Sequence, residues 1–539
     1  MTSDPVRPTT PRPAGVAFRT AFLTAACLLA PAVAVGLARL AVLGRPPFTD
    51  DGWYASIARL SRAGFDPLVH SPVTIYPRAL SFAMSGDGVD GLVTLRLIDG
   101  AVACATAAIV SLLLGRFCGM IRGCLIACVW AAAANSTVFI DAGFKNQILA
   151  ATGLLAASLC CVLPAGDARA SVRALIAGGV LAALAVLVRE SFAPFGLVAT
   201  LACLARNGPR RCATFVATGC VTGLTGLSVV AGGPHRLADL AATWSTTAAA
   251  LSNFAEAMGR PWSAVFIDSG QQALRGASWV TPLMLAASIG GLLVAHRRPL
   301  RAARLFRGDI ASNRRLAPWL GAALVLAPMP EMALKLCFPY HFAQLLLGCA
   351  VLAAARLDGA SLRRSRSRIT AIATITITAI VSGALLPANL RFSDWSWRES
   401  AYWRPVMLEK ADRPELVADS FYLRLADAVR RHAKPGDVVL TGGLYYTLFA
   451  LTDLRPASGL AADAGFIACL PEGDLKRRAL DDLHRTPPNL VIESNRIPVS
   501  LMSMVPGFPQ EFTLAEELAP GSYNSYRNFG AKIWVRVRR

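Results

Sequence analysis

Residues 16–43 read VAFRTAFLTAACLLAPAVAVGLARLAVL, and Phe48-Thr-Asp-Asp-Gly-Trp-Tyr54 follows a few residues later. The first stretch exceeds the roughly 20 predominantly apolar residues that carry a helix across the hydrocarbon core of a bilayer. It is also longer than the apolar region of a cleavable secretion signal, so we expect a retained membrane span. The second stretch places two adjacent carboxylates, Asp50 and Asp51, at the exit of that span. This pair predicts chemistry at the membrane surface.

The composition of the chain indicates a membrane protein. Of its 539 residues, 54% are hydrophobic and 16% are charged, and the mean hydropathy is +0.47. Soluble domains contain about 45–50% apolar and about 25% charged residues. The apolar residues form runs of span length, which predicts an α-helical polytopic membrane protein. The thirteen cysteines lie almost all in or beside these runs, so we expect small buried side chains and no disulfide framework.

Eleven apolar runs predict transmembrane helices, and the arginines between them predict the orientation of the chain. With the N-terminus inside, the arginines within 7–19, 116–122, 169–173, 206–211, 297–315 and 356–368 all fall on the inner side. This is the positive-inside pattern, and it accounts for the net charge of +20 without a nucleic-acid partner. The predicted spans are 16–43, 92–115, 118–138, 146–164, 172–188, 191–206, 212–231, 278–296, 316–333, 336–356 and 369–387. Residues 172–206 are compatible with one long helix or two short ones.

This topology divides the chain into three parts. Residues 1–15 form a disordered cytoplasmic tail, residues 16–387 a transmembrane domain with outer loops 44–91 and 232–277, and residues 388–539 an extracytoplasmic domain. The last part has the charge content of a soluble domain, and helical and strand patterns alternate along it, which predicts an α/β fold. The predicted helices are Ser420–His432 and Asp474–Arg485, and the predicted strands are Val438–Thr441, Leu490–Glu493 and Ala531–Val537.

The residues after the acidic pair have helical spacing, which predicts a short helix in the membrane interface with Trp53 and Tyr54 at headgroup depth. Asp50 or Asp51 would then be its N-cap, which explains one carboxylate but not two. The alternative is a general base that removes the proton of an attacking hydroxyl group, with the second carboxylate orienting the acceptor or holding a divalent cation. The residues alone favour neither interpretation.

Several motifs resemble the GT-C superfamily of polytopic glycosyltransferases. An outer loop that opens with paired acidic residues after the first span is similar to that of the bacterial relatives of protein O-mannosyltransferases (family 39-like) and of aminoarabinose transferases. The usual pair there is Asp-Glu, and this chain has Asp50-Asp51 instead. Other stretches that resemble these proteins are Leu95-Arg-Leu-Ile-Asp-Gly100, Phe338-Pro-Tyr-His-Phe-Ala-Gln-Leu-Leu345, 419–441 and Pro487-Pro-Asn-Leu-Val491.

The resemblance implies transfer of a sugar from a polyprenyl-phosphate donor to a lipid, glycan or protein acceptor, usually with inversion. It places Asp50 at the catalytic acidic position and Asp51 beside it. The expected location is the outer face of a bacterial inner membrane, with the C-terminal domain in the periplasm or outside the cell. No P-loop or dinucleotide-binding glycine pattern occurs in the sequence, in keeping with a donor that arrives through the membrane.

Four basic residues are candidates for binding the donor phosphate. Arg78 lies roughly where the relatives carry a basic residue, although it could equally be a snorkelling interfacial arginine. Arg189 interrupts an apolar stretch near the predicted outer side, where intramembrane charges are functional candidates, although the adjacent Glu190 could simply neutralise it. Lys335 and His341 cluster with Glu331 between the ninth and tenth predicted spans, again on the outer side, and the alternative for His341 is a structural role.

Acidic residues provide candidates for binding the acceptor or a metal. Asp141 lies in the second outer turn, where family members often carry an acidic residue, and Asp51 is the other candidate. A divalent cation such as Mg²⁺ or Mn²⁺ is the cofactor that these carboxylates would hold.

Three other function classes compete with this hypothesis. A flippase or transporter for a lipid-linked sugar would show repeated halves and broken helices, and neither is visible. An O-antigen ligase or polymerase would place essential Arg and His residues in a large late loop, and residues 232–277 contain both types. The third class is a non-catalytic assembly factor.

Overall fold

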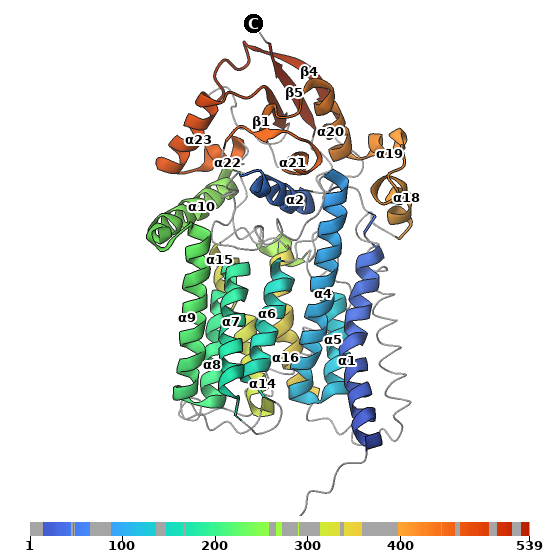
Figure 1. Cartoon of the computed structure of the whole chain (residues 1–539), viewed down its shortest axis with the longest axis vertical. Coiled ribbons are helices and arrows are strands. Elements are labelled where there is room, and N and C mark those ends of the chain that lie inside the picture. Colours follow the sequence, from blue (N-terminus) through green and yellow to red (C-terminus); the bar gives the residue numbers. More distant parts are fainter. Residues whose placement is uncertain are drawn as a thin grey trace, which may run out of the picture.

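The computed structural model of the protein is a helical bundle with a small sheet above one end (Figure 1). The structure describes residues 14–41, 43–44, 47, 49–64, 88–135, 147–164, 169–257, 266–271, 289, 313–334, 339–357, 397–442, 445–458, 464–494, 504–519 and 530–537. A transverse helix, α2 (Thr49–Arg62), lies between the two layers.

The bundle is built from the predicted apolar runs. Such helices are apolar on every side because lipid or another apolar helix surrounds them. Within the part of the chain that the structure describes, three helical segments are long and apolar enough to cross a membrane: Ala21–Leu40, Gly88–Cys118 and Pro209–Ala231. The bundle helices are α1 (Ala14–Ala41), α4 (Gly88–Cys118), α5 (Met120–Ala134), α6 (Gln147–Val162), α7 (Val172–Val188), α8 (Ala193–Asn207), α9 (Pro209–Ala231), α14 (Asn313–Leu326), α15 (Met329–Leu334) and α16 (Leu345–Leu357).

Helices occupy each predicted span that the structure describes. The predicted segment 172–206 forms two helices, because the chain breaks at Arg189 and the short 3₁₀ helix η1 (Glu190–Phe192) separates α7 from α8. The predicted spans 278–296, apart from residue 289, and 369–387 lie outside the described residues. The number of spans and the inward N-terminus therefore stay predictions.

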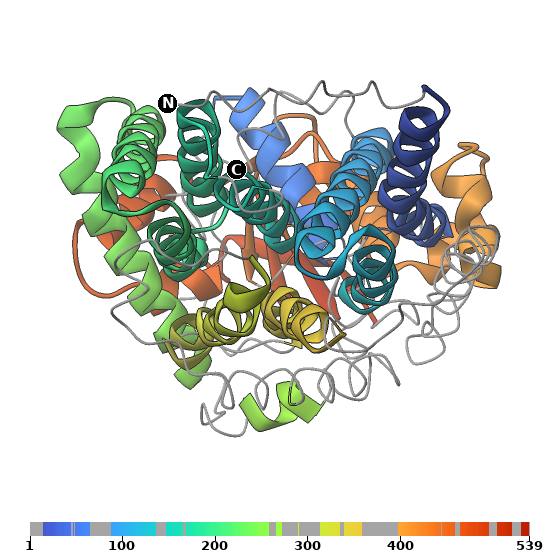
Figure 2. The same ribbon diagram turned by 90° about the horizontal axis from the view of Figure 1, so that it is seen from below.

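Small residues allow the bundle helices to approach closely. A methyl group added at Gly179 of α7 would overlap the backbone carbonyl of Phe215 in α9, and one at Gly123 of α5 would overlap the backbone of Gly115 in α4. Close packing of this kind replaces the hydrophobic driving force that is missing within lipid. Seen from below, α1 (dark blue) and α9 (green) lie at opposite sides of the bundle (Figure 2).

Polar side chains join the helix ends farthest from the sheet. Arg206 donates to Asn313 Oδ1 at 3.1 Å, and Asn207 donates to the carbonyl oxygen of Val162 at 2.9 Å. Arg116 donates to the carbonyl oxygens of Cys160 and Leu163. Arg116 and Arg206 are among the arginines that the charge pattern assigned to one side, and each lies in the last turn of its helix, α4 and α8 respectively.

The C-terminal region forms a mixed five-stranded sheet in the order β2-β1-β3-β5-β4. β1 (Val438–Gly442) is parallel to β2 (Arg455–Pro456) and β3 (Leu490–Ser494), whereas β5 (Ala531–Arg536) is antiparallel to β3 and β4 (Phe512–Leu518). The predicted strands match β1, β3 and β5, and the sequence pattern did not predict β2 or β4. The helices of this region are α18 (Trp397–Met407), α19 (Pro414–Asp419), α20 (Phe421–His432), α21 (Thr447–Leu451), α22 (Ala464–Cys469) and α23 (Asp474–Arg485).

Two helices connect the bundle to the sheet layer. α2 lies beneath α21, and α10 (Leu237–Ala257), which follows the 3₁₀ helix η2 (Pro234–Arg236), lies beneath α22 (Figure 1). Asn253 of α10 donates to the carbonyl oxygen of Cys469 at 3.0 Å. These contacts place α2 at the centre of the junction between the two layers.

Candidate active site

The acidic pair lies in the first turn of α2. The helix begins at Thr49, so Asp50 and Asp51 follow its start and do not precede it as the N-cap interpretation required. Negative charges in a first helical turn are favoured by the backbone dipole, typically by about 0.3–1 kcal/mol. The positions of the two side chains lie outside the described part of the structure, and their roles stay predictions.

α2 is buried between the two layers, and its depth relative to a membrane stays a prediction. Tyr54 is 3% exposed, Ala58 is fully buried and Leu60 is 3% exposed. The hydroxyl of Tyr54 lies 2.8 Å from Oε1 of Gln147 at the start of α6, in a buried hydrogen bond. Protein therefore covers α2 where the sequence pattern predicted lipid.

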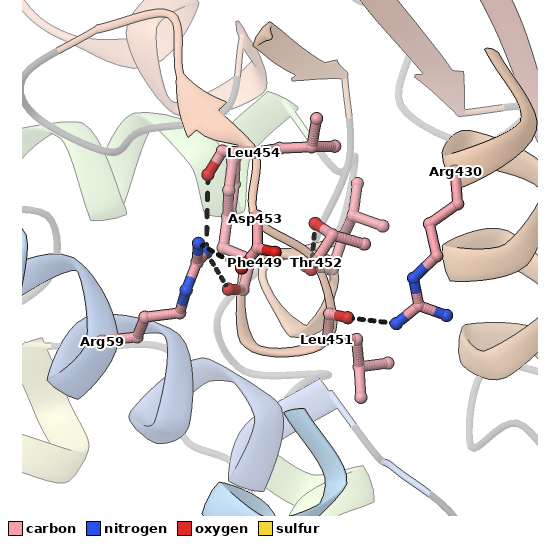
Figure 3. A network of polar contacts seen from close by, with 8 residues as sticks. Arg59, Arg430, Phe449, Leu451, Thr452, Asp453 and Leu454 are labelled. Carbon is pink, nitrogen blue, oxygen red and sulfur yellow. Dashed lines mark hydrogen bonds and ion pairs between the residues drawn. The ribbon is translucent and has the colours of Figure 1, made fainter. Parts of the chain in front are cut away.

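The sheet layer binds α2 from the other side. Arg59 donates to the carbonyl oxygen of Phe449 at 2.7 Å and forms an ion pair with Asp453 at 3.2 Å (Figure 3). Ser56 donates to the carbonyl oxygen of Tyr446. Hydrogen bonds to both layers therefore fix α2, the helix that carries the acidic pair.

Gly52 brings α2 and α21 into close approach next to the acidic pair. A methyl group at this position would overlap all three side-chain heavy atoms of Thr447, which is fully buried. Only glycine leaves room for α21 at this distance.

The chain that leads into α2 is also fixed. Arg96 of α4 is 1% exposed and donates to the carbonyl oxygen of Leu43 at 2.9 Å. Arg39 of α1 is 4% exposed and donates to Asn135 Oδ1 at 3.0 Å. Buried charges within a membrane bundle are costly. The presence of these two arginines therefore indicates that the segment before α2 must be held in a defined position.

A second polar cluster forms around Glu331 of α15. Its Oε1 lies 2.8 Å from Nη2 of Arg189 and 3.9 Å from Nε2 of His341, and its Oε2 accepts a hydrogen bond of 2.6 Å from Gln344. The side chains of Arg189, Glu331 and His341 are 14%, 4% and 6% exposed. His341 and Gln344 belong to the 3₁₀ helix η3 (Pro339–Gln344). α15 lies at the same end of the bundle as α2 (Figure 1).

The structure thus brings together two of the four predicted phosphate ligands, Arg189 and His341. Arg78, Lys335 and Asp141 lie outside the described residues. Arg189 pairs with Glu331, a residue 142 positions away, whereas the sequence suggested the adjacent Glu190 as its partner. Within the described part of the chain, no group of three or more His, Cys, Asp or Glu side chains could hold a metal ion.

An apolar groove begins beside this cluster. It has a volume of about 310 Å³ and runs between α7, α8 and α9, with Glu190 among its lining residues. Val216 and Cys220 of the lining are exposed, so the groove lies on the outside of the bundle. Gly219 and Gly223 also line it, and a Cβ atom at Gly223 would meet nothing within 4 Å. The rest of the lining is mostly apolar, and Glu190 is the chain neighbour of Arg189 in the polar cluster.

Sequence reasoning missed three features of this region. Gln344 appeared only as part of a family motif, although a polar side chain one helical turn from His341 indicates a shared polar face. Arg59 resembled an ordinary basic residue of an interfacial helix. The contact between Gly52 and Thr447 joins residues that are far apart in the chain, so no local pattern indicates it.

No protein-family model matches the chain, and the comparison with curated proteins finds no match. The solved structures show the class of fold, which is the GT-C fold. One similar structure is ArnT from Cupriavidus metallidurans bound to undecaprenyl phosphate, with a TM-score of 0.52 and 14% identity over 96% of this chain and 98% of that one. The apo state of the same protein gives a TM-score of 0.51 and 15% identity over the same shares. A weaker similarity, with a TM-score of 0.48 and 12% identity over 88% of this chain and 70% of that one, is to the apo oligosaccharyltransferase of Archaeoglobus fulgidus. At these identities the similarity shows the fold alone.

Proposed function

We propose that the chain is a membrane glycosyltransferase that moves a sugar from a polyprenyl-phosphate donor to a lipid, glycan or protein acceptor. The observation that carries this proposal is the position of α2. The helix with Asp50 and Asp51 is fixed between bundle and sheet, at the same end as the buried cluster of Arg189, Glu331 and His341. The ArnT structure of the same fold has undecaprenyl phosphate bound, which supports a donor of this class.

In the proposed reaction, Asp50 is the general base. Its carboxylate accepts the proton of the acceptor hydroxyl group as that oxygen attacks the anomeric carbon of the sugar. The bond between that carbon and the phosphate oxygen breaks, and polyprenyl phosphate leaves with the bonding electron pair. Attack from the face opposite the phosphate inverts the anomeric configuration. Asp51 orients the acceptor.

Arg189 and His341, together with Arg78 and Lys335, are the proposed ligands of the donor phosphate. The contacts of Glu331 with Arg189 and Gln344 hold the arginine at the end of the bundle. The charge and planar fork of a guanidinium group suit phosphate oxygens. The groove beside Glu190 is the proposed position of the first isoprenoid units of the donor.

We also propose that the site binds a divalent cation. Asp51 and Asp141 are the candidate ligands, and Mg²⁺ or Mn²⁺ bound to them would stabilise negative charge on the phosphate as it leaves. Removal of metal with EDTA, followed by addition of each ion, tests this point. Full transfer in EDTA would exclude it.

We place the reaction on the outer face of a bacterial inner membrane. The arginines between the spans favour an inward N-terminus, and α2 and the sheet then lie outside. A cysteine-labelling experiment with an impermeant reagent at position 478, an exposed arginine of α23, tests this orientation.

The decisive experiment supplies purified protein with a radiolabelled polyprenyl-phosphate sugar and a crude envelope acceptor fraction. We expect Asp50→Asn to lose transfer by about 10²-fold or more while the fold is retained, because asparagine keeps the shape of the side chain but not its basicity. Asp239→Asn is the matched control, since Asp239 is exposed in the first turn of another helix, α10. Transfer that survives both Asp50→Asn and Asp51→Asn would refute the assignment of the base.

Bulk added inside the groove tests the donor site. Gly223→Leu is expected to raise the KM for the donor at least several-fold, because the new side chain enters the groove without meeting the backbone. Leu224→Phe, one position along α9 and 57% exposed, is the control. Equal KM values for the two variants would remove the groove from the proposal.

A further inference from the structure

The last turn of α21 is the place where α2 meets the sheet layer. A helix leaves its last carbonyl groups without partners inside the helix, and cationic side chains are favoured there. In α21 the carbonyl of Leu448 accepts from Thr452, that of Phe449 from Arg59, and that of Leu451 from Arg430 (Figure 3). Two arginines from different elements therefore bind one helix end.

The two arginines come from different parts of the molecule. Arg430 belongs to α20, in the same layer as α21, whereas Arg59 comes from α2. Arg59 also reaches the carbonyl oxygen of Leu454 at 3.4 Å, just beyond α21. The Arg59 side chain is 18% exposed and Asp453 is 74% exposed, so solvent weakens their ion pair and the carbonyl bonds determine the contact.

We propose that Arg59 is a positioning residue: it docks α2 on the last turn of α21, so that the sheet layer sets the location of Asp50 and Asp51. The inference rests on the proposed function, because it assumes that this pair acts on the acceptor. Arg59 lies nine residues after Asp50, about 13 Å along a rigid helix. Tyr54 holds the middle of α2 against α6, so release of the far end lets the helix pivot about that contact.

A pivot of this kind misplaces the base more than the donor. Arg189 and His341 lie on other elements, and their contacts with Glu331 do not involve α2. Misplacement of a catalytic group by about 1 Å can lower a rate by about 10²-fold. Arg59→Ala is therefore expected to lower kcat by about tenfold to a hundredfold with the KM for the donor within about twofold.

The test measures transfer kinetics and backbone amide exchange of the purified full chain for Arg59→Ala, Arg59→Lys and Arg62→Ala. Faster exchange in α2 together with the fall in kcat is the expected result for Arg59→Ala. Arg59→Lys should recover part of the rate, since an ammonium group can still reach one carbonyl oxygen. Arg62 is exposed three residues further along α2, and its variant should match the wild type in both measurements.

Wild-type kcat in folded Arg59→Ala would overturn the inference, and so would a rise in donor KM with kcat unchanged. If Arg59→Ala does not fold, the intermediate rate expected for Arg59→Lys decides, and a wild-type rate there would count against the role. Failure of the proposed function is distinguishable, because the wild-type protein then shows no transfer at all. A wrong assignment of the base appears instead as transfer that survives both Asp50→Asn and Asp51→Asn. The exchange of α2 amides still reports whether Arg59 docks the helix in that case.

Discussion

A single methyl group at Gly52 is expected to disrupt the site more than it destabilises the fold. The new Cβ would lie far inside contact with the side chain of Thr447, closer than the 3.0 Å below which real Cβ atoms essentially never lie. Carbon atoms pack at about 3.5 Å or more, so α2 and α21 must separate by about 1 Å. The overlap occurs one residue from Asp51, so the displacement acts directly on the acidic pair.

The magnitudes of these effects differ. Overpacking of this kind costs about 1–3 kcal/mol, and replacing glycine by alanine inside a helix returns about 1 kcal/mol. The net loss of stability is then no more than about 2 kcal/mol. A displacement of about 1 Å at a catalytic group lowers the rate by about 10²-fold. We therefore expect Gly52→Ala to be a folded protein with about 1% of the wild-type transfer rate.

The assay compares transfer of a radiolabelled sugar by purified Gly52→Ala with that by Gly52→Ala/Thr447→Gly. The second change removes the three atoms that lie nearest to the new methyl group, so it should restore most of the rate. Gly36→Ala in α1 is the matched control, because its nearest neighbour would be Cys104 Sγ at 3.5 Å, an ordinary contact. Wild-type transfer by Gly52→Ala would refute the reasoning, and so would a loss that Thr447→Gly does not relieve.

Three further predictions concern the supports of the site. Tyr54→Phe should lower stability by about 1 kcal/mol through loss of its buried hydrogen bond to α6, which thermal unfolding would detect; an unchanged midpoint would contradict the bond. Ser420→Ala removes the N-cap of α20 and should cost about 1 kcal/mol; an unchanged unfolding midpoint would exclude capping. Burial raises the pKa of Glu516, but hydrogen bonds from Arg431 and His432 outweigh it and hold that pKa below its ordinary value of 4.5. The stability that this carboxylate contributes is present above pH 4.5 and is lost as the pH falls through the lowered pKa, so the gap between wild type and Glu516→Gln should narrow in acid; a constant gap would refute the ion pairing.

The helices of the bundle could be predicted from the sequence because each is a local apolar run between charged turns. The same holds for α20 and α23, whose apolar residues recur at helical spacing, and for β1, β3 and β5, which are continuous or alternating apolar segments. β2 has only two residues, and most of β4 is exposed or half-buried, so neither has a strong apolar pattern. The local sequence pattern is sufficient to predict an element that is long and faces one environment.

The candidate site was only partly predictable. Arg189, Glu331 and His341 could be identified because each is a polar residue at the same predicted end of the bundle. Their mutual contacts depend on how α7, α15 and η3 pack, which no spacing encodes. The burial of α2 was missed for the same reason. Its pattern of apolar residues with a polar face is the same whether lipid or a second layer of protein covers it. Tertiary contacts, such as that of Arg59 with Phe449, distinguish the two.

The shared end of α21 has a consequence for the construction of chimaeras. One of the groups that complete this helix comes from α2, almost 400 positions earlier in the chain. A sheet layer transplanted from a homologue would bring its own version of α21 but not its partner on α2. Exchange of residues 397–537 alone should therefore give poorly active hybrids. Exchange together with residues 49–64 should preserve the contact between α2 and α21. These two segments should therefore be exchanged together, although they are far apart in the sequence.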